Sequence, residues 1–576
     1  MKLKVREAIY KIQEITDLKD MLKKTVEKFG DRPAYVFKTE EVGKFKEITY
    51  NEFKNDIDGL GTALINLGLK DKRIAVIGNN RYEWAVSYLS ITNGTGVVVP
   101  LDKALPNNEI ENLIMRSEVE AIIYASKYEG IMEELKNKRN TNLKYFISMD
   151  LQENKNGVIS LNKLIENGKE QIEKGDRKFL DAKINSGVMG IMLFTSGTTS
   201  QSKAVMLSHK NIVNDLMYIS SVLYIDENDR FLSFLPLHHT FECTAGFLFP
   251  ISRGSSIAFC DGIRHIANNI KEYEITIMVS VPILYENMCK KIMKSIESQG
   301  KLKTVNFGMK ISDGLLKVGI DIRNKLFKQI HENLGSKLRL LVAGGAALDP
   351  ETEKIFNGLG ITMYQGYGLT ETSPVIAVED DKYRKNGSIG KALPGLEVKI
   401  KDENDEGIGE LLVKGPTVML GYYQNEEATK EIIDESGWLN TGDLAKIDKE
   451  GFIFITGRKK YVIVLKNGKN VYPEELEILI NKIAGVTESF VYGKKEADGD
   501  YKVSAKIVYD KDIVKDIYGI EGNKDIKEKL WQEVKRINKT MPTYKYIKEI
   551  SITDEELIKT TTKKIKRHEE MKKITM

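Results

Sequence analysis

The chain has 576 residues, too many for one hydrophobic core, so we expect two or more domains. With 41% hydrophobic and 30% charged residues it is typical of a soluble globular protein, and its net charge of +4 gives no reason to expect a nucleic-acid ligand. Three cysteines without metal or disulfide spacing favour a reducing cytosol, and the apolar runs are too short for a secretory signal or a bilayer span.

The N-terminal segment, residues 1–15, mixes lysines with aliphatic residues, which indicates a basic surface helix or, alternatively, an arm. This segment leaves weak peripheral contact with a membrane open, whereas the chain as a whole is expected to be cytoplasmic.

Short β-branched runs then alternate with amphipathic helical stretches through the first half of the chain. This alternation predicts βαβ units around buried parallel sheets. The runs are RIAVIG (73–78), GVVVP (96–100), AIIYAS (121–126), SIAFC (256–260) and TIMVSVP (276–282).

The stretch IMLFTSGTTSQSKAVMLSH, Ile191–His209, consists of an apolar strand, a loop of Ser, Thr and Gly that ends on Lys203, and a second apolar strand. Hydroxyls, backbone N–H groups and one ammonium at such a turn can bind a polyphosphate. The stretch is not a Walker P-loop, because it lacks GxxxxGK[ST] and is followed by a strand in place of a helix. Taken alone, it is also compatible with an ordinary polar hairpin turn.

Farther along the chain, PLHHTFE places His238 and His239 side by side, and a lysine-rich helical region is expected from Leu302 to Gly335. The strand LRLLVAGGA follows, and its glycines on their own predict only a turn. In YQGYGLTET (364–372), a threonine hydroxyl beside a carboxylate is suited to bind a phosphate together with Mg²⁺.

After Gly387, short strands are separated by Gly, Pro and Asp turns, which predicts an antiparallel, barrel-like subdomain that includes TGDLAKIDKEGFIFITGRKK (441–460). From Arg458 onward, a compact, lysine-rich α/β segment suits an anionic ligand or simply has a solvated basic surface. We therefore expect domains at 1–457 and 458–576, joined by a short hinge. The run KTTTKKIKR (559–567) lies near the end of the second domain.

The loop Thr195–Lys203 and the segments 364–372, 441–460 and 559–567, in this order, resemble the adenylate-forming superfamily of acyl-CoA synthetases, adenylation domains and beetle luciferase. The resemblance extends from Thr25 to Arg567. The helical region 302–335 and a slightly long loop from Arg458 to Gly468 resemble the long-chain fatty acyl-CoA synthetase branch. The implied fold is α/β: a large N-terminal domain of two βαβ-type sheet subdomains plus an antiparallel barrel-like subdomain, followed by a small, mobile α+β C-terminal domain.

For ATP, the resemblance implies that the Ser/Thr/Gly loop folds over the β- and γ-phosphates. The residues concerned are Thr195, Ser196, Gly197, Thr198, Thr199 and Lys203. The loop departs from the family pattern TSGTTGxPKG at Ser200, Ser202 and Ala204, which keeps the phosphate-binding groups but can alter the mobility of the loop.

The same resemblance implies a binding site for the rest of the nucleotide. In it, Tyr367 stacks on adenine, with Gly345 and Ala346 as the opposite wall. Thr370 contacts the α-phosphate and Glu371 binds Mg²⁺.

Asp443 is implied to bind the ribose hydroxyls, and Arg458 adds a second ribose contact. His239 matches the family histidine that borders the acyl pocket, where we expect it to shape the pocket. His238 matches no family role.

Lys564 takes the place of the family lysine that bridges the carboxylate and the α-phosphate during adenylation. Lys563 is the competing candidate, because Ile558 and Lys563 stand where the family has Pro and Gly, and a basic surface tail also fits this segment. Lys460 corresponds to the family hinge residue, and Gly468 to the glycine on the domain face that opens a pantetheine channel for coenzyme A.

Together these features imply an ATP-dependent long-chain fatty acid–CoA ligase that uses Mg²⁺. A fatty acid and ATP give acyl-AMP and pyrophosphate, and the thiol of coenzyme A then displaces AMP. The first alternative is transfer to a separate acyl carrier protein. A luciferase-like monooxygenase has no support in the residues, and a non-catalytic relative is disfavoured by the phosphate loop, Glu371 and Lys564. Acyl chain length and oligomeric state are not predicted.

Overall fold

The computed structural model describes residues 6–39, 41, 43–138, 141–195, 202–496, 499–560 and 564–575. The chain forms two compact units. The first unit comprises Met1–Glu397 and Lys414–Leu439, and the second comprises Val398–Val413 and Asn440–Met576. The boundary that we predicted between residues 457 and 458 stays a prediction.

The first unit contains an eight-stranded sheet in the order β19-β9-β8-β4-β3-β5-β6-β7. Each neighbouring pair in the run β8-β4-β3-β5-β6-β7 is parallel. At the other end of the sheet, β9 pairs antiparallel with both β8 and β19. Their bounds are β3 (Lys72–Ile77), β4 (Gly96–Pro100), β5 (Ala121–Tyr124), β6 (Tyr145–Ser148), β7 (Val158–Ser160), β8 (Met189–Thr195), β9 (Lys203–Ser208) and β19 (Gly421–Tyr422). The runs RIAVIG, GVVVP and AIIYAS thus form the central parallel strands, because residues that are apolar on both faces need cover on both faces.

A nine-stranded sheet in the same unit has the order β16-β15-β14-β13-β12-β10-β11-β1-β2. Strands β1, β11, β10, β12, β13 and β14 are parallel, and β2, β15 and β16 run antiparallel at the two edges. The bounds are β1 (Pro33–Lys38), β2 (Phe45–Thr49), β10 (Arg230–Ser233), β11 (Ser256–Phe259), β12 (Ile277–Ser280), β13 (Leu340–Ala343), β14 (Thr362–Gly368), β15 (Val375–Val378) and β16 (Lys391–Ala392).

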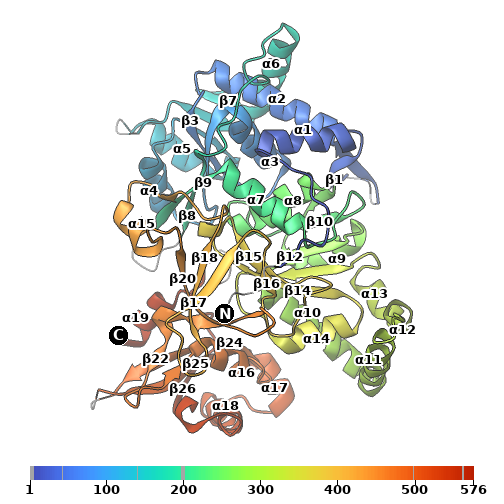
Figure 1. Cartoon of the computed structure of the whole chain (residues 1–576), viewed down its shortest axis with the longest axis vertical. Helices are drawn as coiled ribbons and strands as arrows, with labels where there is room; N and C mark the ends of the chain where they lie inside the picture. Colours follow the sequence, from blue (N-terminus) through green and yellow to red (C-terminus); the bar gives the residue numbers. More distant parts are fainter. Residues whose placement is uncertain are drawn as a thin grey trace. The chain divides into compact units, whose positions relative to one another are not determined.

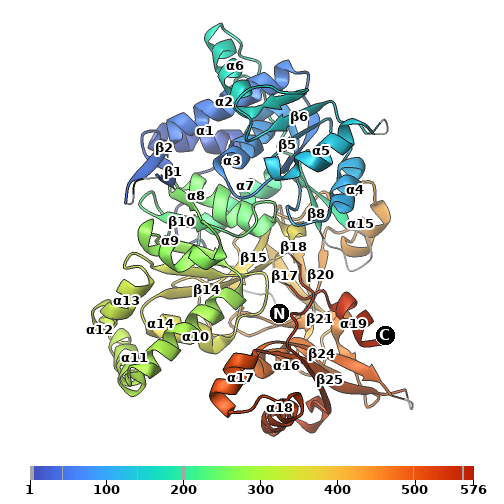
Figure 2. The same cartoon turned by 180° about the vertical axis from the view of Figure 1, so that it is seen from behind.

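Helices cover both sheets of the first unit, and α10 to α14 lie together beside the nine-stranded sheet in both views (Figures 1 and 2). The expected helical region 302–335 is confirmed, since α11, α12 and α13 fall within it. The helices are α1 (Leu18–Phe29), α2 (Tyr50–Asn66), α3 (Tyr82–Ser90), α4 (Asn107–Ser117), α5 (Glu129–Lys136), α6 (Leu161–Glu173), α7 (His209–Ser220), α8 (Phe249–Ser252), α9 (Ile266–Glu272), α10 (Pro282–Ser298), α11 (Leu302–Leu316), α12 (Arg323–Leu326), α13 (Lys328–Leu334), α14 (Pro350–Gly358) and α15 (Glu426–Ile432).

Short 3-10 and π-helical turns join these elements in the first unit. They include the π-helices η1 (Ile91–Thr95) and η3 (Glu242–Leu248) and the 3-10 turns η2 (Ser126–Tyr128), η4 (Ile263–His265) and η5 (Thr370–Thr372). Within the described residues, the chain has no helix long and apolar enough to cross a membrane.

Residues 6–17 form an arm without a helix, so the surface helix that we preferred is wrong for the described part of the N-terminal segment; residues 1–5 lie outside the described residues. The guanidinium of Arg6 is buried, forms an ion pair with Asp380, and donates to the backbone carbonyls of Val378 at 2.8 Å and Lys391 at 2.9 Å. These partners lie at a sheet edge far along the sequence. A short-range pattern of lysines and aliphatic residues therefore could not reveal them.

The second unit contains a four-stranded sheet in the order β17-β18-β20-β21, in which β20 and β21 pair antiparallel, and a three-stranded sheet β24-β25-β26. Its strands are β17 (Glu397–Lys401), β18 (Gly409–Lys414), β20 (Leu439–Ile447), β21 (Ile453–Arg458), β22 (Ile463–Val464), β23 (Asn470–Val471), β24 (Val486–Lys495), β25 (Tyr501–Tyr509) and β26 (Glu549–Thr553). Its helical elements are η6 (Lys459–Tyr461), α16 (Pro473–Ile480), α17 (Lys511–Tyr518), α18 (Asn523–Asn538), η7 (Thr543–Lys545) and α19 (Arg567–Thr575). Two parallel-sheet layers and a separate α+β C-terminal part confirm the predicted fold class, whereas the mobility of the C-terminal domain stays a prediction.

Candidate active site

The predicted phosphate loop joins β8 to β9. Thr195, the last residue of β8, pairs with Lys203, the first residue of β9, and its hydroxyl is 3.4 Å from the Lys203 carbonyl oxygen. The AVML run is a strand, as predicted. Of the loop residues, Ser196, Gly197, Thr198 and Thr199 lie outside the described residues, so their roles stay predictions.

An arginine holds the end of this loop. Arg116 of α4 donates to the carbonyl oxygen of Ser202 at 2.7 Å and to its hydroxyl at 3.2 Å, and its guanidinium lies over the Phe194 ring. Ser202 is one of the positions at which the loop departs from the family pattern. These two hydrogen bonds hold the backbone next to Lys203, and the sequence patterns did not reveal them.

Lys203 and Glu371 are connected through a tyrosine that we did not predict. The hydroxyl of Tyr422 donates to Oε1 of Glu371 at 2.8 Å, and Nζ of Lys203 lies 4.8 Å from the centre of the Tyr422 ring. Tyr422 belongs to β19, which pairs with β9. The structure thus brings two predicted catalytic groups into contact with one aromatic side chain.

Thr370 and Glu371 form η5 directly after β14. The hydroxyl of Thr240 donates to that of Thr370 at 3.0 Å, and the carbonyl of Glu371 accepts from Met419 N–H at 2.9 Å. Gly368 precedes this turn, and a Cβ there would lie 1.8 Å from the Pro374 carbonyl oxygen, so only glycine fits.

The predicted adenine-binding residues occupy the same edge of the nine-stranded sheet. Gly345 and Ala346 follow β13 and are exposed, while Tyr367 is partly buried in the neighbouring β14. Strands β13 and β14 are parallel, so their carboxyl ends meet at one edge, where α/β proteins commonly bind ligands. Gly345 has a φ of +82°, which a glycine adopts at little cost. The stacking of adenine on Tyr367 stays a prediction.

The two histidines differ in their surroundings. His239 is half-buried, and its Nδ1 accepts from Phe241 N–H at 3.3 Å. The next residue in the sequence, Thr240, is the one that donates to the Thr370 hydroxyl. His238 lies 3.4 Å from Asp102 through Nε2, and burial lowers its pKa to about 4 despite the nearby carboxylate. His238 is therefore a neutral packed residue at neutral pH.

A buried carboxyl group that sequence reasoning missed lies in η3. Glu242 is 1% exposed; its Oε1 accepts from Ser233 Oγ at 2.6 Å, and its Oε2 has no hydrogen-bond partner among the described residues. Burial raises the pKa of Glu242 to about 8. This glutamate is thus neutral at neutral pH, and the only sequence signal for it was its position directly after PLHHTF.

The described residues contain no group of three or more His, Cys, Asp or Glu side chains arranged to hold a metal ion. Mg²⁺ usually takes one or two carboxylates and completes its shell with water and substrate phosphates. Glu371, with the Thr370 hydroxyl beside it, fits such a shared site. It would not hold the ion by itself.

In the second unit, Asp443 and Arg458 are cross-strand neighbours on β20 and β21, and their side chains form an ion pair of 2.7 Å. Asp443 is 5% exposed, and its N–H donates to the Thr441 hydroxyl. The pair holds the Asp443 carboxylate in place, but its binding to ribose stays a prediction.

The remaining predicted residues also lie in the second unit. Lys564 is exposed and its N–H donates to the Thr560 hydroxyl at 3.1 Å, whereas Lys563 lies outside the described residues. Lys460 is exposed in η6, with Nζ 4.5 Å from the Tyr461 ring centre. Gly468 forms the turn between β22 and β23 at a φ of +76°, with open space around it. The roles of these residues stay predictions.

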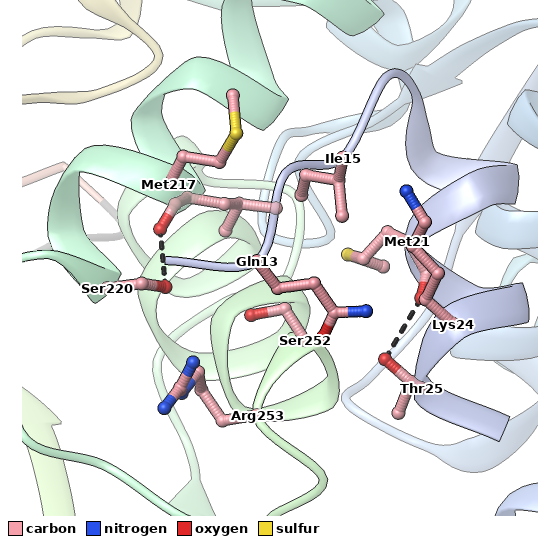
Figure 3. A pocket seen from close by; sticks show the side chains of 10 residues that line it. Gln13, Ile15, Met21, Lys24, Thr25, Met217, Ser220, Ser252 and Arg253 are labelled. Carbon is pink, nitrogen blue, oxygen red and sulfur yellow. Dashed lines mark hydrogen bonds between the residues drawn. The ribbon is translucent and has the colours of Figure 1, made fainter. Parts of the chain in front are cut away.

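A separate small pocket of the first unit lies between the N-terminal arm, α1, α7 and α8, with Gln13 reaching toward its centre (Figure 3). Its lining residues are Gln13, Ile15, Met21, Lys24, Thr25, Leu216, Met217, Ser220, Ser252 and Arg253. None of the predicted site residues is among them, so we assign the pocket no part in the reaction.

Comparison with known proteins identifies the family of the chain. Residues 22–423 match the model of a family described as AMP-binding enzyme, and residues 460–574 match its C-terminal domain. Long-chain-fatty-acid–CoA ligase FadD15 of Mycobacterium bovis is 28% identical over 80% of this chain and 78% of its own length. Long-chain-fatty-acid–CoA ligase 6 of Homo sapiens is 29% identical, covering 88% of this chain and 78% of its own length.

The name of a third relative gives an acyl carrier protein, and not coenzyme A, as the acceptor. It is the chloroplastic long-chain-fatty-acid–[acyl-carrier-protein] ligase AEE15 of Arabidopsis thaliana, 26% identical over 90% of this chain and 79% of its own. Among solved structures, an anthranilate CoA ligase bound to anthranoyl-AMP has a TM-score of 0.76 at 22% identity and covers 97% of each chain. The likeness to this structure supports the fold, and the family matches confirm the predicted resemblance.

Proposed function

Because the chain belongs to the AMP-binding enzyme family, we propose that it is an ATP-dependent ligase that activates a long-chain fatty acid and transfers it to coenzyme A. In the first step, a carboxylate oxygen of the fatty acid attacks the α-phosphorus of ATP, and the bond to pyrophosphate breaks. In the second step, the sulfur of coenzyme A attacks the acyl carbonyl carbon, AMP leaves, and the thiol proton is released.

We propose a role for each side chain from its chemistry and from the family resemblance. Lys203 binds the β- and γ-phosphates as a point charge, and the Thr370 hydroxyl donates to the α-phosphate. Glu371 would hold Mg²⁺, and the ion, when bound, would neutralise charge that develops on the phosphates. In the second unit, Asp443 orients the ribose, and Lys564 bridges the attacking carboxylate and the α-phosphate.

The observation that carries this proposal is the grouping of Lys203, Glu371 and Thr370 in the first unit, through contacts to Tyr422 and Thr240. A cation, a carboxylate and a hydroxyl within one cluster are the groups that a magnesium-bound triphosphate requires. We further propose a cytoplasmic enzyme in which Lys460 is the hinge between the two half-reactions.

The decisive experiment measures pyrophosphate and AMP release from ATP with fatty acids of increasing length, with and without coenzyme A. The proposal expects pyrophosphate with the fatty acid, and an acyl thioester with AMP release only when coenzyme A is present. The Arabidopsis relative motivates one competing acceptor, so a parallel reaction contains a phosphopantetheine-bearing acyl carrier protein. If the thioester forms only on the carrier protein, the acceptor is the carrier protein and not coenzyme A. If no acid leads to pyrophosphate release, the proposal is wrong.

A further inference from the structure

We propose that Tyr422 is a positioning residue of the active site, which holds the metal-binding carboxylate of Glu371 and the ammonium of Lys203 in one fixed arrangement. The inference rests on the proposed function, since it takes Glu371 as the ligand of a magnesium ion shared with ATP. It adds a residue that lies outside the segments in which we predicted site residues.

The backbone around Tyr422 is fixed from several sides. Tyr422 pairs with Val205 across β19 and β9, its N–H donates to the hydroxyl of Thr429 at 2.9 Å, and the next N–H along the chain, that of Tyr423, donates to the Ala204 carbonyl at 2.8 Å. The Tyr422 side chain is only 6% exposed. A phenol held in this way has little freedom to leave Glu371.

The hydrogen bond to Glu371 engages one oxygen of the carboxylate, Oε1, at 2.8 Å. The second oxygen is thereby turned to a defined direction, which is what a cation that accepts a single carboxylate oxygen requires.

The ring of the same tyrosine provides the contact to the phosphate loop. Nζ of Lys203 lies 4.8 Å from the ring centre, within the range of a cation–π interaction. Lys203 also begins β9, the strand with which β19 pairs. The Lys203 ammonium, proposed to bind phosphate, and the Glu371 carboxylate, proposed to bind the metal, thus both contact the side chain of Tyr422.

The neighbouring Tyr423 offers a matched control. Its hydroxyl donates to Oε2 of Glu118 at 2.9 Å, and its ring lies 5.2 Å from the Arg73 guanidinium carbon. It therefore makes the same two kinds of contact as Tyr422, but with a carboxylate and a cation that have no proposed role. Replacing either tyrosine by phenylalanine removes one oxygen atom and keeps the ring.

The test measures metal binding directly, with Mn²⁺ as the probe and electron paramagnetic resonance as the readout, in the presence of α,β-methylene-ATP, which cannot release pyrophosphate. Changes to residues that orient metal ligands typically weaken metal binding about ten- to hundredfold, and we expect a loss in this range for Tyr422→Phe. Tyr423→Phe should bind Mn²⁺ like the wild type. In a Glu371→Gln background, Tyr422→Phe should cause no further loss, because the hydrogen bond to a metal-binding carboxylate is already gone.

The outcomes separate the inference from the proposed function. If Glu371→Gln abolishes Mn²⁺ binding and Tyr422→Phe leaves it unchanged, the inference is wrong and the metal assignment stands. If Glu371→Gln binds Mn²⁺ as the wild type does, the metal assignment itself is wrong. A second readout needs no tyrosine variant: when the ATP analogue is already bound, adding Mg²⁺ should change the tyrosine ultraviolet spectrum of the wild type and not that of Glu371→Gln. An identical spectral change in both proteins would contradict the inference.

Discussion

Replacing Glu242 by glutamine should stabilise the first unit at neutral pH, because it removes a buried carboxyl group that ionises only in the unfolded chain at this pH. Glu242 is enclosed in η3, and burial raises its pKa from 4.5 to about 8, opposed by the Ser233 hydroxyl, the charge of Lys103 and the backbone N–H of Phe234. The carboxyl group is therefore protonated in the folded chain and ionised in the unfolded chain at pH 7. Glutamine reproduces the protonated form, with an amide in place of the hydroxyl.

The sign and the size of the effect follow from this difference. Between pH 4.5 and about pH 8 the unfolded state releases a proton that the folded state keeps, so the stability of the wild type falls as the pH rises through this window. Each pH unit in the window is worth about 1.4 kcal/mol, so at pH 7 the cost is about 3 kcal/mol. Below pH 4.5 both states are protonated and the cost disappears.

Urea unfolding of the full chain at several pH values checks this expectation. Trp84 is a suitable fluorescent reporter, because its ring centre lies 6.1 Å from that of Phe247 in η3. The stability difference between Glu242→Gln and the wild type should be under about 1 kcal/mol at pH 5 and should grow with pH toward about 3 kcal/mol at pH 7. A difference that does not change with pH would refute the reasoning.

Glu379 is the matched comparison for this variant. Burial raises its pKa to about 8 as well, but both of its oxygens accept backbone N–H groups, from Gln365 and from Lys385, each at 3.0 Å. An amide there would turn an N–H₂ group toward a second donor, so Glu379→Gln should destabilise the chain by about 1–3 kcal/mol at low pH. If both variants are more stable than the wild type, the lack of a hydrogen-bond partner at Oε2 of Glu242 among the described residues does not explain the stabilisation.

The remaining predictions concern the reaction. Glu371→Ala should lower pyrophosphate release by at least about a hundredfold with the fold intact, and release at the wild-type rate would disprove the metal assignment. The ratio kcat/KM should rise with acyl chain length by up to about fourfold per methylene until the pocket ends, so a maximum at acetate would contradict a long-chain substrate. Arg116→Ala should raise the KM for ATP about fivefold by releasing Ser202, and an unchanged KM would show that the contact does not order the loop. Lys564→Ala should lose acyl-AMP formation yet convert supplied acyl-AMP to thioester, whereas Lys460→Pro should do the reverse, because a fixed φ obstructs the hinge. Equal loss of both half-reactions in both variants would favour one static site, and a defect in Lys563→Ala alone would move the catalytic lysine by one position.

The parallel sheets could be predicted because their signal is local. Runs such as GVVVP are apolar at every position, and only a strand covered on both faces buries them fully. The N-terminal arm could not be predicted in the same way. In this arm, Arg6 forms an ion pair with Asp380, which lies 374 positions later in the sequence. A short-range periodicity cannot encode a contact over such a distance along the chain.

The candidate site shows the same division. Thr370 and Glu371 could be found from a motif, since a hydroxyl beside a carboxylate already indicates the chemistry. Tyr422 could not, because the tyrosines of GYY differ only in their tertiary partners: one donates to Glu371 and its neighbour to Glu118. Glu242 was missed for a related reason, since nothing in its sequence context reveals that its carboxyl group is enclosed.

The hydrogen bond between Tyr422 and Glu371 also connects the two sheets of the first unit. Tyr422 and Lys203 lie on β19 and β9 of the eight-stranded sheet, whereas Glu371 follows β14 of the nine-stranded sheet. Neither sheet alone carries both the cation and the carboxylate. The cluster therefore exists only when the two sheets are packed in their native register, and a substitution that loosens this packing should weaken metal binding before it unfolds either sheet. Metal affinity is for this reason a more sensitive measure of the packing between the sheets than global stability.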